Sequence, residues 1–313
     1  MIAVTYTGAG GPEVVSVTER PDPEPGSHEV VVRSTHAGLN PADLAQRAGR
    51  YPAPTGSPQD IPGLEVSGTV AACGAAVTAW KPGDRVFGIV GGGGLADTVV
   101  AHERHLARVP DSLDDRAAAA VPEAFITAHD AVFTRAGLLM GETLLVNGAT
   151  GGVGTAGVQL GAAVGARVLA NARAHHDALA ELGAEPTALE DASGVDVVLE
   201  LVGAQNLAGS LDALAPLGRV IVVGTGAGAE TDISLRVLMG KRASVMGTVL
   251  RARPLEQKAA AVQAFAHQVV PLLESGRVRP LVDRVFPAAD AVAAFDHLAA
   301  PGKLGKVLLE FGA

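Results

Sequence analysis

Two patterns of hydrophobic positions follow one another along the chain. The first third holds short runs that are rich in β-branched residues and separated by Pro and Gly, which predict β-strands. These runs cover residues 2–6, 13–19, 28–37, 66–73, 84–90 and 97–102. Their length and spacing predict a mainly antiparallel, barrel-like domain.

From about residue 120 the pattern changes to short apolar runs separated by alanine-rich stretches that are long enough for helices. Strands buried on both faces and joined by crossover helices give this pattern. It therefore predicts an α/β fold with a doubly wound parallel sheet. The predicted strands cover residues 143–149, 166–172, 195–202 and 218–225, with 243–250 as the candidate last strand.

The end of the chain returns to the first pattern. Residues 254–276 predict one helix, with Pro254 at its start and Gly276 near its end. The tail that follows predicts a strand, a helix and a strand. We therefore expect residues 1–119 plus 265–313 to form a catalytic domain, and residues 120–264 to form an inserted dinucleotide-binding domain.

Glycine is dense between residues 148 and 157, after a predicted strand and before a predicted helix that runs to about Ala163. Two registers of a dinucleotide-binding motif fit, Ala149-x-Gly151-x-x-Gly154 and Gly152-x-Gly154-x-x-Gly157. Either register brings backbone amides and the positive end of a helix dipole up to a pyrophosphate. A tight turn that binds nothing is the alternative, and the strand–turn–helix context argues against it. The loop residues assigned to the cofactor are Ala149, Thr150, Gly151, Gly152, Val153 and Gly154.

The tip of the second parallel strand predicts which dinucleotide binds. In an NAD-specific fold, an acidic residue about twenty positions beyond the glycines accepts hydrogen bonds from the ribose. Ala172 stands at that position, and Arg173, His175 and His176 follow it. A guanidinium forms paired, charged hydrogen bonds with a phosphate. We therefore expect NADPH, with its 2′-phosphate at these three side chains; an exposed arginine at a loop tip is the alternative.

Composition narrows the classes of function. Of the 313 residues, 48% are apolar and 18% are charged, as in a folded protein rather than a disordered one. No apolar run reaches the roughly 18 residues of a membrane span, and the first residues lack the pattern of an export signal. With one cysteine and a net charge of −9, we expect a cytoplasmic protein with neither nucleic acid nor a membrane as its partner.

Several stretches resemble the medium-chain dehydrogenase/reductase superfamily, and within it the zinc-free quinone oxidoreductase branch. They include AGLNPADLAQRAGRYP at 37–52, IPGLEVSGTV at 61–70, the glycine loop, LRARPLEQKAAAVQAF at 250–265 and the terminal GKVLLEF. The last two are similar to p53-inducible quinone reductase homologues. The resemblance implies a GroES-like catalytic domain that carries an inserted Rossmann domain.

The residues argue against the zinc chemistry of the family's alcohol dehydrogenases. Where those enzymes place a zinc-binding Cys and a His, this chain has Asn40 and Leu64. A leucine cannot coordinate a metal, and the four-cysteine structural lobe of those enzymes is missing. His102 and His105 lack the i, i+4 spacing of a helical zinc motif and a third ligand. We expect no bound metal.

A hydride can still pass to an acceptor that is already electrophilic, such as a quinone or an α,β-unsaturated carbonyl. The protein then supplies orientation and a polar contact to the developing oxyanion. The catalytic candidates are Asn40, Asp43 and Tyr51. Asn40 and Asp43 also fit the N-cap and N3 positions of a helix, and for Asn40 capping and ligand contact are equal alternatives. The resemblance places a substrate-side tyrosine at Tyr51, whose alternative is packing with its hydroxyl in solvent.

The resemblance carries further cofactor contacts to this chain by position. They are Thr127, Gly224, Thr225, Thr248, Leu250 and Lys306, for which packing of Thr127 and a solvated Lys306 are the alternatives. Family members often have a Tyr where this chain has Gln46 and Leu95. These departures remove aromatic hydroxyls from the expected site. Residues 91–94, all glycine, leave room at its mouth or form a mobile loop.

The leading prediction is a zinc-independent, NADPH-dependent reductase of quinones or enones. A trans-acting enoyl reductase on an acyl thioester or polyketide intermediate is the enzymatic alternative. A non-catalytic NADPH-binding protein is the alternative from another class. Because the predicted strand at 243–250 ends the sheet, its unpaired edge invites a second strand, and the resemblance implies a homodimer.

Overall fold

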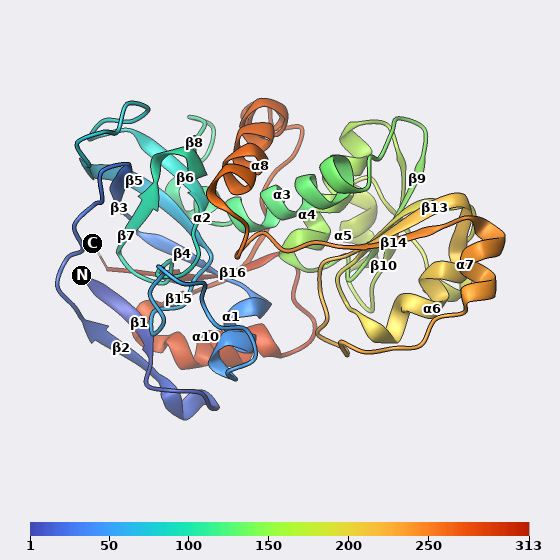
Figure 1. Ribbon diagram of the computed structural model, residues 1–313, viewed down its shortest axis with the longest axis horizontal. Helices are drawn as coiled ribbons and strands as arrows, with labels where there is room; N and C mark the ends of the chain where they lie inside the picture. Colours follow the sequence, from blue (N-terminus) through green and yellow to red (C-terminus); the bar gives the residue numbers. More distant parts are fainter. Residues whose placement is uncertain (313) are drawn as a thin grey trace. The chain divides into compact units, whose positions relative to one another are not determined.

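The computed structural model describes residues 1–312 and separates into two units (Figure 1). The first unit holds residues 1–126, 250–276 and the chain from 280 onward; the second holds 127–249 and 277–279. Residues 250–264, which the sequence prediction gave to the inserted domain, group here with the first unit. The reason is contact with segments that follow early strands. Arg251 donates to the Gly91 carbonyl at 2.7 Å. Glu256 of helix α8 (Leu255–Gln268) pairs with Arg104 at 2.6 Å.

Antiparallel strands build the first unit. Its largest sheet has the order β7-β3-β5-β6-β8, and a smaller sheet, β15-β16-β4, brings the end of the chain beside an early strand. Each run predicted in the first third contains a strand, so the mainly antiparallel prediction is confirmed. The strands are β1 (Ile2–Tyr6), β2 (Val15–Glu19), β3 (Glu29–Arg33), β4 (His36–Leu39), β5 (Glu65–Cys73), β6 (Arg85–Ile89), β7 (Thr98–His102), β8 (Leu106–Arg108), β15 (Val282–Pro287) and β16 (Lys306–Glu310).

Proline residues mark where several helices of this unit begin. The single helix predicted over 254–276 is two helices, α8 and α9, which meet at Val269. Pro271 explains the break, because proline donates no backbone hydrogen bond and its ring clashes with the preceding turn. The other helices are α1 (Pro41–Arg47), α2 (Asp115–Ala119), α3 (Pro122–His129), which runs into the second unit, α9 (Val270–Glu274) and α10 (Ala291–Ala299).

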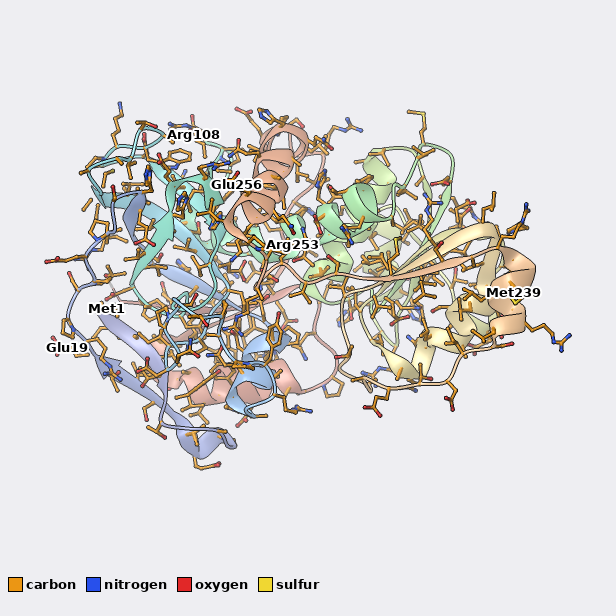
Figure 2. The ribbon with its side chains drawn as sticks, viewed as in Figure 1. Met1, Glu19, Arg108, Met239, Arg253 and Glu256 are labelled. Carbon is orange, nitrogen blue, oxygen red and sulfur yellow. The ribbon has the colours of Figure 1, made fainter. Side chains whose placement is uncertain are left out.

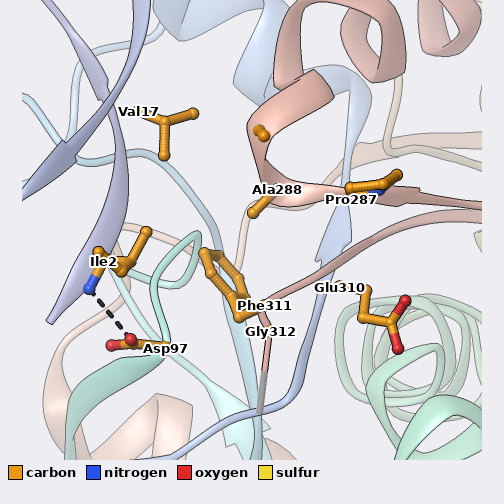
Figure 3. A pocket seen from close by; sticks show the side chains of 9 residues that line it. Ile2, Val17, Asp97, Pro287, Ala288, Glu310, Phe311 and Gly312 are labelled. Carbon is orange, nitrogen blue, oxygen red and sulfur yellow. Dashed lines mark hydrogen bonds between the residues drawn. The ribbon is translucent and has the colours of Figure 1, made fainter.

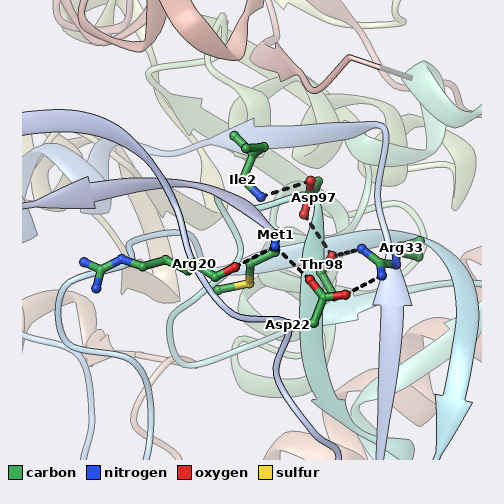
Figure 4. Close-up of polar contacts among 7 residues, drawn as sticks. All are labelled: Met1, Ile2, Arg20, Asp22, Arg33, Asp97 and Thr98. Atoms are coloured by element: carbon green, nitrogen blue, oxygen red, sulfur yellow. Dashed lines mark hydrogen bonds and ion pairs between the residues drawn. The ribbon is translucent and has the colours of Figure 1, made fainter.

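Hydrogen bonds fix the first residues of the chain to this unit (Figure 4). The Met1 ammonium donates to Asp22 Oδ1 at 2.7 Å, and the other oxygen of Asp22 accepts from Arg33 at 2.6 Å. The Ile2 amide donates to Asp97 Oδ2 at 3.0 Å. Within residues 1–312, no helix is long and apolar enough to cross a membrane.

The second unit is built on a six-stranded parallel sheet in the order β11-β10-β9-β12-β13-β14. The predicted doubly wound sheet is confirmed, and 243–250 does contain the last strand, β14. Its elements are β9 (Thr143–Asn147), α4 (Gly152–Ala163), β10 (Arg167–Asn171), α5 (His176–Glu181), β11 (Glu185–Pro186), β12 (Val195–Glu200), α6 (Ala204–Ala213), β13 (Leu214–Val222), α7 (Leu235–Lys241) and β14 (Ser244–Gly247).

Both faces of this sheet are buried, which explains its continuous apolar runs. In β9, Leu144 and Val146 belong to the core cluster on one face, and Leu145 belongs to the cluster on the other. The strand order reverses between β9 and β12. In open sheets of this kind, ligands bind outside the carboxyl ends of the strands at such a reversal. Asn147 and Glu200 end the two strands there.

Candidate functional site

The N-terminus of α1 is capped as the sequence predicts. Asn40 is extended and precedes Pro41, and its amide donates to Asp43 Oδ2 at 2.8 Å. The other oxygen of Asp43 accepts from the Gly63 amide at 3.0 Å. Burial raises the pKa of Asp43 to about 6, although the two backbone hydrogen bonds and the charge of Lys306 oppose the rise. Asp43 therefore fixes α1 against the loop at Gly63.

The side chain of Asn40 turns away from the cap. Its Oδ1 accepts from Lys306 Nζ at 2.6 Å, and its Nδ2 donates to Glu65 Oε1 at 2.8 Å. Lys306 Nζ also donates to Glu65 Oε1 at 2.6 Å and to the Leu39 carbonyl at 2.8 Å. We call Asn40, Glu65 and Lys306 the lysine cluster. All three side chains are buried, so the alternative of a solvated Lys306 is wrong.

Sequence reasoning missed the role of Glu65. Its second oxygen accepts from the Glu123 amide at 2.8 Å, so both oxygens of this buried carboxylate are satisfied. Strand β4 comes close because residue 38 is glycine: a Cβ there would lie 2.3 Å from Glu65 Oε1. The available signal was an acidic residue that opens an otherwise apolar strand run.

The donor set at this place does not fit zinc. The Asn40 amide and the Glu65 carboxylate are the groups that could act as ligands. Lys306 Nζ, however, already donates to Asn40 Oδ1 and to Glu65 Oε1, and it places its own positive charge between them. Leu64, at the other expected ligand position, is buried and apolar. Among residues 1–312, no group of three or more His, Cys, Asp or Glu side chains is arranged to hold a metal ion.

Tyr51 lies beside an arginine that the sequence analysis did not single out. The guanidinium carbon of Arg251 is 5.1 Å from the centre of the Tyr51 ring, and Arg251 Nη1 donates to the Tyr51 carbonyl at 3.0 Å. Burial is the main cause that raises the pKa of the Tyr51 phenol. The Tyr51 side chain is therefore half-buried and its ring packs against Arg251. The signal for Arg251 was a cation directly after an apolar run.

The two departures from the family's tyrosines have different consequences. Gln46 accepts from Arg251 through Oε1 and donates to the Gln59 carbonyl at 3.1 Å, so it joins the neighbourhood of Tyr51. Leu95 is fully buried in a core cluster with Val4 and Tyr6. The position of Leu95 thus serves packing in this chain.

Residues 91–94 pack closely against neighbouring backbone and side chains. A Cβ at Gly91 would lie 2.2 Å from Ser57 Oγ, and one at Gly94 would lie 2.3 Å from the Glu65 carbonyl oxygen. The last three of the four glycines are buried. Their lack of side chains allows neighbouring backbone to approach closely, which is a packing role.

The glycine loop of the second unit has the close approaches that both predicted registers require. Gly151 caps α4 and is exposed, whereas Gly154 is buried and a Cβ on it would lie 2.3 Å from the Gly148 carbonyl oxygen. Gly151 thus leaves room for a pyrophosphate. Gly154 allows the helix to approach the turn, and Gly157, whose Cβ would lie 2.7 Å from Leu199 Cδ2, allows it to approach strand β12, so both registers fit the packing. The first amides of α4 have no partner within the helix. This cradle fits a dinucleotide.

A buried polar network lies at the carboxyl ends of β9, β10 and β12, and the sequence analysis missed it. Asn147 Nδ2 donates to Glu200 Oε2 at 2.6 Å, and Asn171 Nδ2 donates to Asn147 Oδ1 at 2.8 Å. The other oxygen of Glu200 accepts from the amides of Val202 and Gly203. The network holds the three strand ends in register beneath the glycine loop.

The predicted phosphate-binding side chains follow β10. Arg173, His175 and His176 are all exposed. His176 Nε2 lies 3.0 Å from the Ala172 carbonyl oxygen, which turns the chain back into α5. His175 adopts a left-handed conformation with φ of 62°. The structure therefore gathers three basic side chains on one loop at the carboxyl edge of the sheet.

The remaining predicted cofactor residues occupy separate places. Gly224 and Thr225 follow β13, and Thr225 lines a small cavity of about 60 Å³ together with Glu200 and Gly203. Thr248 Oγ1 donates to Asp130 Oδ2 at 3.3 Å. Thr127 and Leu250 are buried, and they belong to the second and first unit respectively.

The larger cavity, of about 260 Å³, lies elsewhere in the first unit (Figure 3). Ile2, Val17 and Phe311 give it apolar walls, and Asp97 and Glu310 are its two carboxylates. Its nine described lining residues are not those predicted for catalysis. The chemistry therefore points to the lysine cluster and Tyr51 instead.

Comparison with known proteins agrees with this geometry. Residues 26–111 match the alcohol dehydrogenase GroES-like domain, and residues 164–309 match the zinc-binding dehydrogenase family. The quinone oxidoreductase of Rattus norvegicus is 33% identical and covers 99% of this chain and 97% of its own. The spectinabilin polyketide synthase protein of Streptomyces orinoci is 35% identical over 96% of this chain, which spans 14% of that protein. The solved quinone oxidoreductase of Pseudomonas syringae aligns with a TM-score of 0.87 at 28% identity, covering 99% of each chain.

Fold and relatives together define an oxidoreductase with a GroES-like domain and a Rossmann-like domain. The chain belongs to the quinone oxidoreductase branch of the medium-chain dehydrogenase/reductase superfamily. Membership implies a nicotinamide cofactor and a small-molecule substrate.

Proposed function

We propose that this protein reduces quinones or α,β-unsaturated carbonyls with NADPH and without zinc. The lysine cluster carries the proposal: the Lys306 ammonium neutralises the buried Glu65 carboxylate and binds the Asn40 amide oxygen. The resemblance to zinc-dependent alcohol dehydrogenases implies that those enzymes have a metal ligand at the position of Asn40. A chain built in this way needs an acceptor that is electrophilic without a Lewis acid. Conjugated carbonyls have that property.

The second unit supplies the cofactor half of the proposed activity. The exposed Gly151 and the amides of the first turn of α4 would bind the pyrophosphate. Arg173, with His175 and His176, would bind the 2′-phosphate. When bound, the reduced nicotinamide supplies a hydride.

The first unit supplies the acceptor half. The Tyr51 phenol would donate a hydrogen bond, and finally a proton, to the acceptor oxygen as negative charge develops there. Lys306 and Asp43 would hold Asn40 and the start of α1 in place. Gln46 and Arg251 form the wall behind Tyr51.

The test is oxidation of NADPH by the purified protein against a panel of ortho-quinones, para-quinones, 2-alkenals and enoyl thioesters, with and without a chelator. We expect turnover of quinones or enones that the chelator leaves unchanged. Loss of activity on removal of one zinc per chain would contradict the proposal. Tight binding of NADPH without turnover of any acceptor would favour the non-catalytic function.

The match to a polyketide synthase protein supports a second candidate, reduction of an enoyl thioester in trans. The same panel separates the two functions. A kcat/KM that is highest for enoyl thioesters, and at least tenfold above that for the best quinone, would favour the enoyl reductase.

We also propose a homodimer formed through β14. This strand lies at one end of the parallel sheet, and within residues 1–312 no strand pairs with its outer edge. Leu235 and Met239 on α7 add exposed apolar surface in the segment before it, and Met239 projects outward with 76% exposure (Figure 2). Light scattering at micromolar concentration should give twice the monomer mass, and Val245→Lys should lower it. A wild-type monomer would overturn this proposal.

A further inference from the structure

Arg251 joins three separate segments of the first unit around Tyr51. Its Nε donates to the Gly91 carbonyl at 2.7 Å, its Nη1 to the Tyr51 carbonyl at 3.0 Å, and its Nη2 to Gln46 Oε1 at 2.5 Å. These acceptors come from α1, from the loop after α1 and from the loop after β6. The side chain is 4% exposed. One guanidinium thus fixes the position of the whole loop that carries Tyr51.

The three hydrogen-bond acceptors of Arg251 are neutral, and the negative charges of Asp43 and Glu123 act on the buried guanidinium without a direct ion pair among the contacts described above. Burying a cation costs free energy that nearby opposite charges offset. A second buried cation, Lys258 on α8, donates to the Arg251 carbonyl at 2.9 Å and secures its backbone.

The charge also faces the aromatic ring. At 5.1 Å from the ring centre, the guanidinium lies within the range of cation–π contacts, which hold a ring in one orientation. Gln46 binds the same guanidinium through Oε1, so an amide oxygen and an aromatic ring contact one cation.

We propose that Arg251 is a positioning residue that sets the orientation of Tyr51 and places a fixed positive charge beside it. This charge favours acceptors whose reduced form carries a phenolate or enolate oxygen, such as quinones and enones. The proposal rests on the proposed function, in which Tyr51 meets the acceptor oxygen. Arg251 itself acts through Tyr51.

The first test is a double-mutant cycle with Tyr51→Phe and Arg251→Met, measured as kcat and KM for one quinone. Each single variant should lower kcat about ten- to a hundredfold. If Arg251 acts through the phenol, Arg251→Met should cost less in the Tyr51→Phe protein than in the wild type. Additive losses would overturn the proposal. Arg50→Met, an exposed arginine beside Tyr51 in sequence, is the matched control and should leave kcat unchanged.

A second measurement does not depend on activity. The chain has two tyrosines, and burial and the nearby Asp43 strongly raise the pKa of the other one, Tyr6. An alkaline absorbance titration therefore reports Tyr51 first. Burial and the negative charge of Glu123 raise the pKa of the Tyr51 phenol, and the Arg251 charge lowers it. Arg251→Met removes only the lowering influence, so it should shift this titration to higher pH. Arg251→Lys should shift it less, since it keeps the charge but loses the three-way hydrogen bonding.

The outcomes separate the two proposals. If the wild type reduces no quinone or enone but the titration shifts as expected, the proposed function fails and the positioning by Arg251 stands. If the wild type is active while the cycle is additive and the titration does not move, Arg251 has no such role. Should Arg251→Met fail to fold by circular dichroism, Arg251→Lys and Gln46→Leu give the same two measurements.

Discussion

Two regions of the molecule differ in the exposure of their charged side chains. In the acceptor-side region, which holds the lysine cluster, Asp43 and Arg251, charged side chains are buried and bound to one another or to backbone. The second region, which we call the glycine-loop edge, instead exposes Gly151 and the basic side chains of Arg173, His175 and His176. In the first region, the charged groups lose their water on folding. In the second region, the exposed groups stay hydrated until a ligand binds them.

The difference predicts where a mutation is felt. In the acceptor-side region, removal of one member leaves another charge buried without its partner, so stability falls first. At the glycine-loop edge, removal of a side chain leaves the fold intact and affects only what binds. The predictions below test this contrast.

The largest effect is expected for Lys306→Met. It leaves Glu65 buried with its negative charge uncompensated, which should lower the free energy of unfolding by about 3–5 kcal/mol. Denaturant unfolding measures this loss. Lys81→Met, at an exposed lysine, is the control and should change stability by less than about 0.5 kcal/mol.

The partner variant makes the test sharper. In Glu65→Gln/Lys306→Met the uncompensated charge is gone, so this protein should be more stable than Lys306→Met alone. A double variant that loses the sum of both single effects would show that packing, and not charge, explains the cluster.

At the glycine-loop edge, Arg173→Ala should leave stability unchanged and alter cofactor choice. Loss of one charged, paired contact to the 2′-phosphate is worth about 1.5–3 kcal/mol. The ratio of kcat/KM for NADPH over NADH should therefore fall about ten- to a hundredfold. Arg236→Ala, at an exposed arginine on α7, is the control. A wild type that prefers NADH, or an unchanged ratio in the variant, would refute the assignment of Arg173.

The features that could be predicted from the sequence are local, and those that could not be predicted join distant parts of the chain. Periodicity predicts strands because both faces of the parallel sheet are buried, and motif spacing predicts the glycine loop because its geometry is local. The cap formed by Asn40 and Asp43 was predictable for the same reason. The pairing of Glu65 with Lys306 joins residues 241 positions apart, and that of Gln46 with Arg251 joins residues 205 apart. Such contacts depend on the fold and leave no local pattern.

The smallest expected effect concerns pH, and it arises from two groups of the first unit, the half-buried His105 and the buried Asp43, whose effects on stability have opposite signs. Burial lowers the pKa of His105 to about 4, with the charges of Lys258, His102 and Arg104 acting in the same direction. Its ring nitrogen lies 3.2 Å from the Leu255 carbonyl oxygen of α8. In the unfolded chain a histidine binds its proton near pH 6.5. Between pH 6.5 and 4, His105 therefore binds a proton in the unfolded state but not in the folded state. The free energy of unfolding falls as the pH falls through this range.

Asp43 acts in the reverse direction, because its folded pKa of about 6 lies above the unfolded value of 3.8. Between these values the folded state binds the proton first, so stability rises as pH falls. In the wild type the two effects partly cancel. His105→Gln removes one of them, so on going from pH 7 to pH 5 the variant should gain about 1–2 kcal/mol relative to the wild type, allowing for solvent screening. Urea unfolding at both pH values measures this difference. His267→Gln, at an exposed histidine of α8, is the control and should show the same pH dependence of stability as the wild type. If His105→Gln also shows the wild-type pH dependence, the His105 ring is protonated as easily in the folded protein as in the unfolded chain.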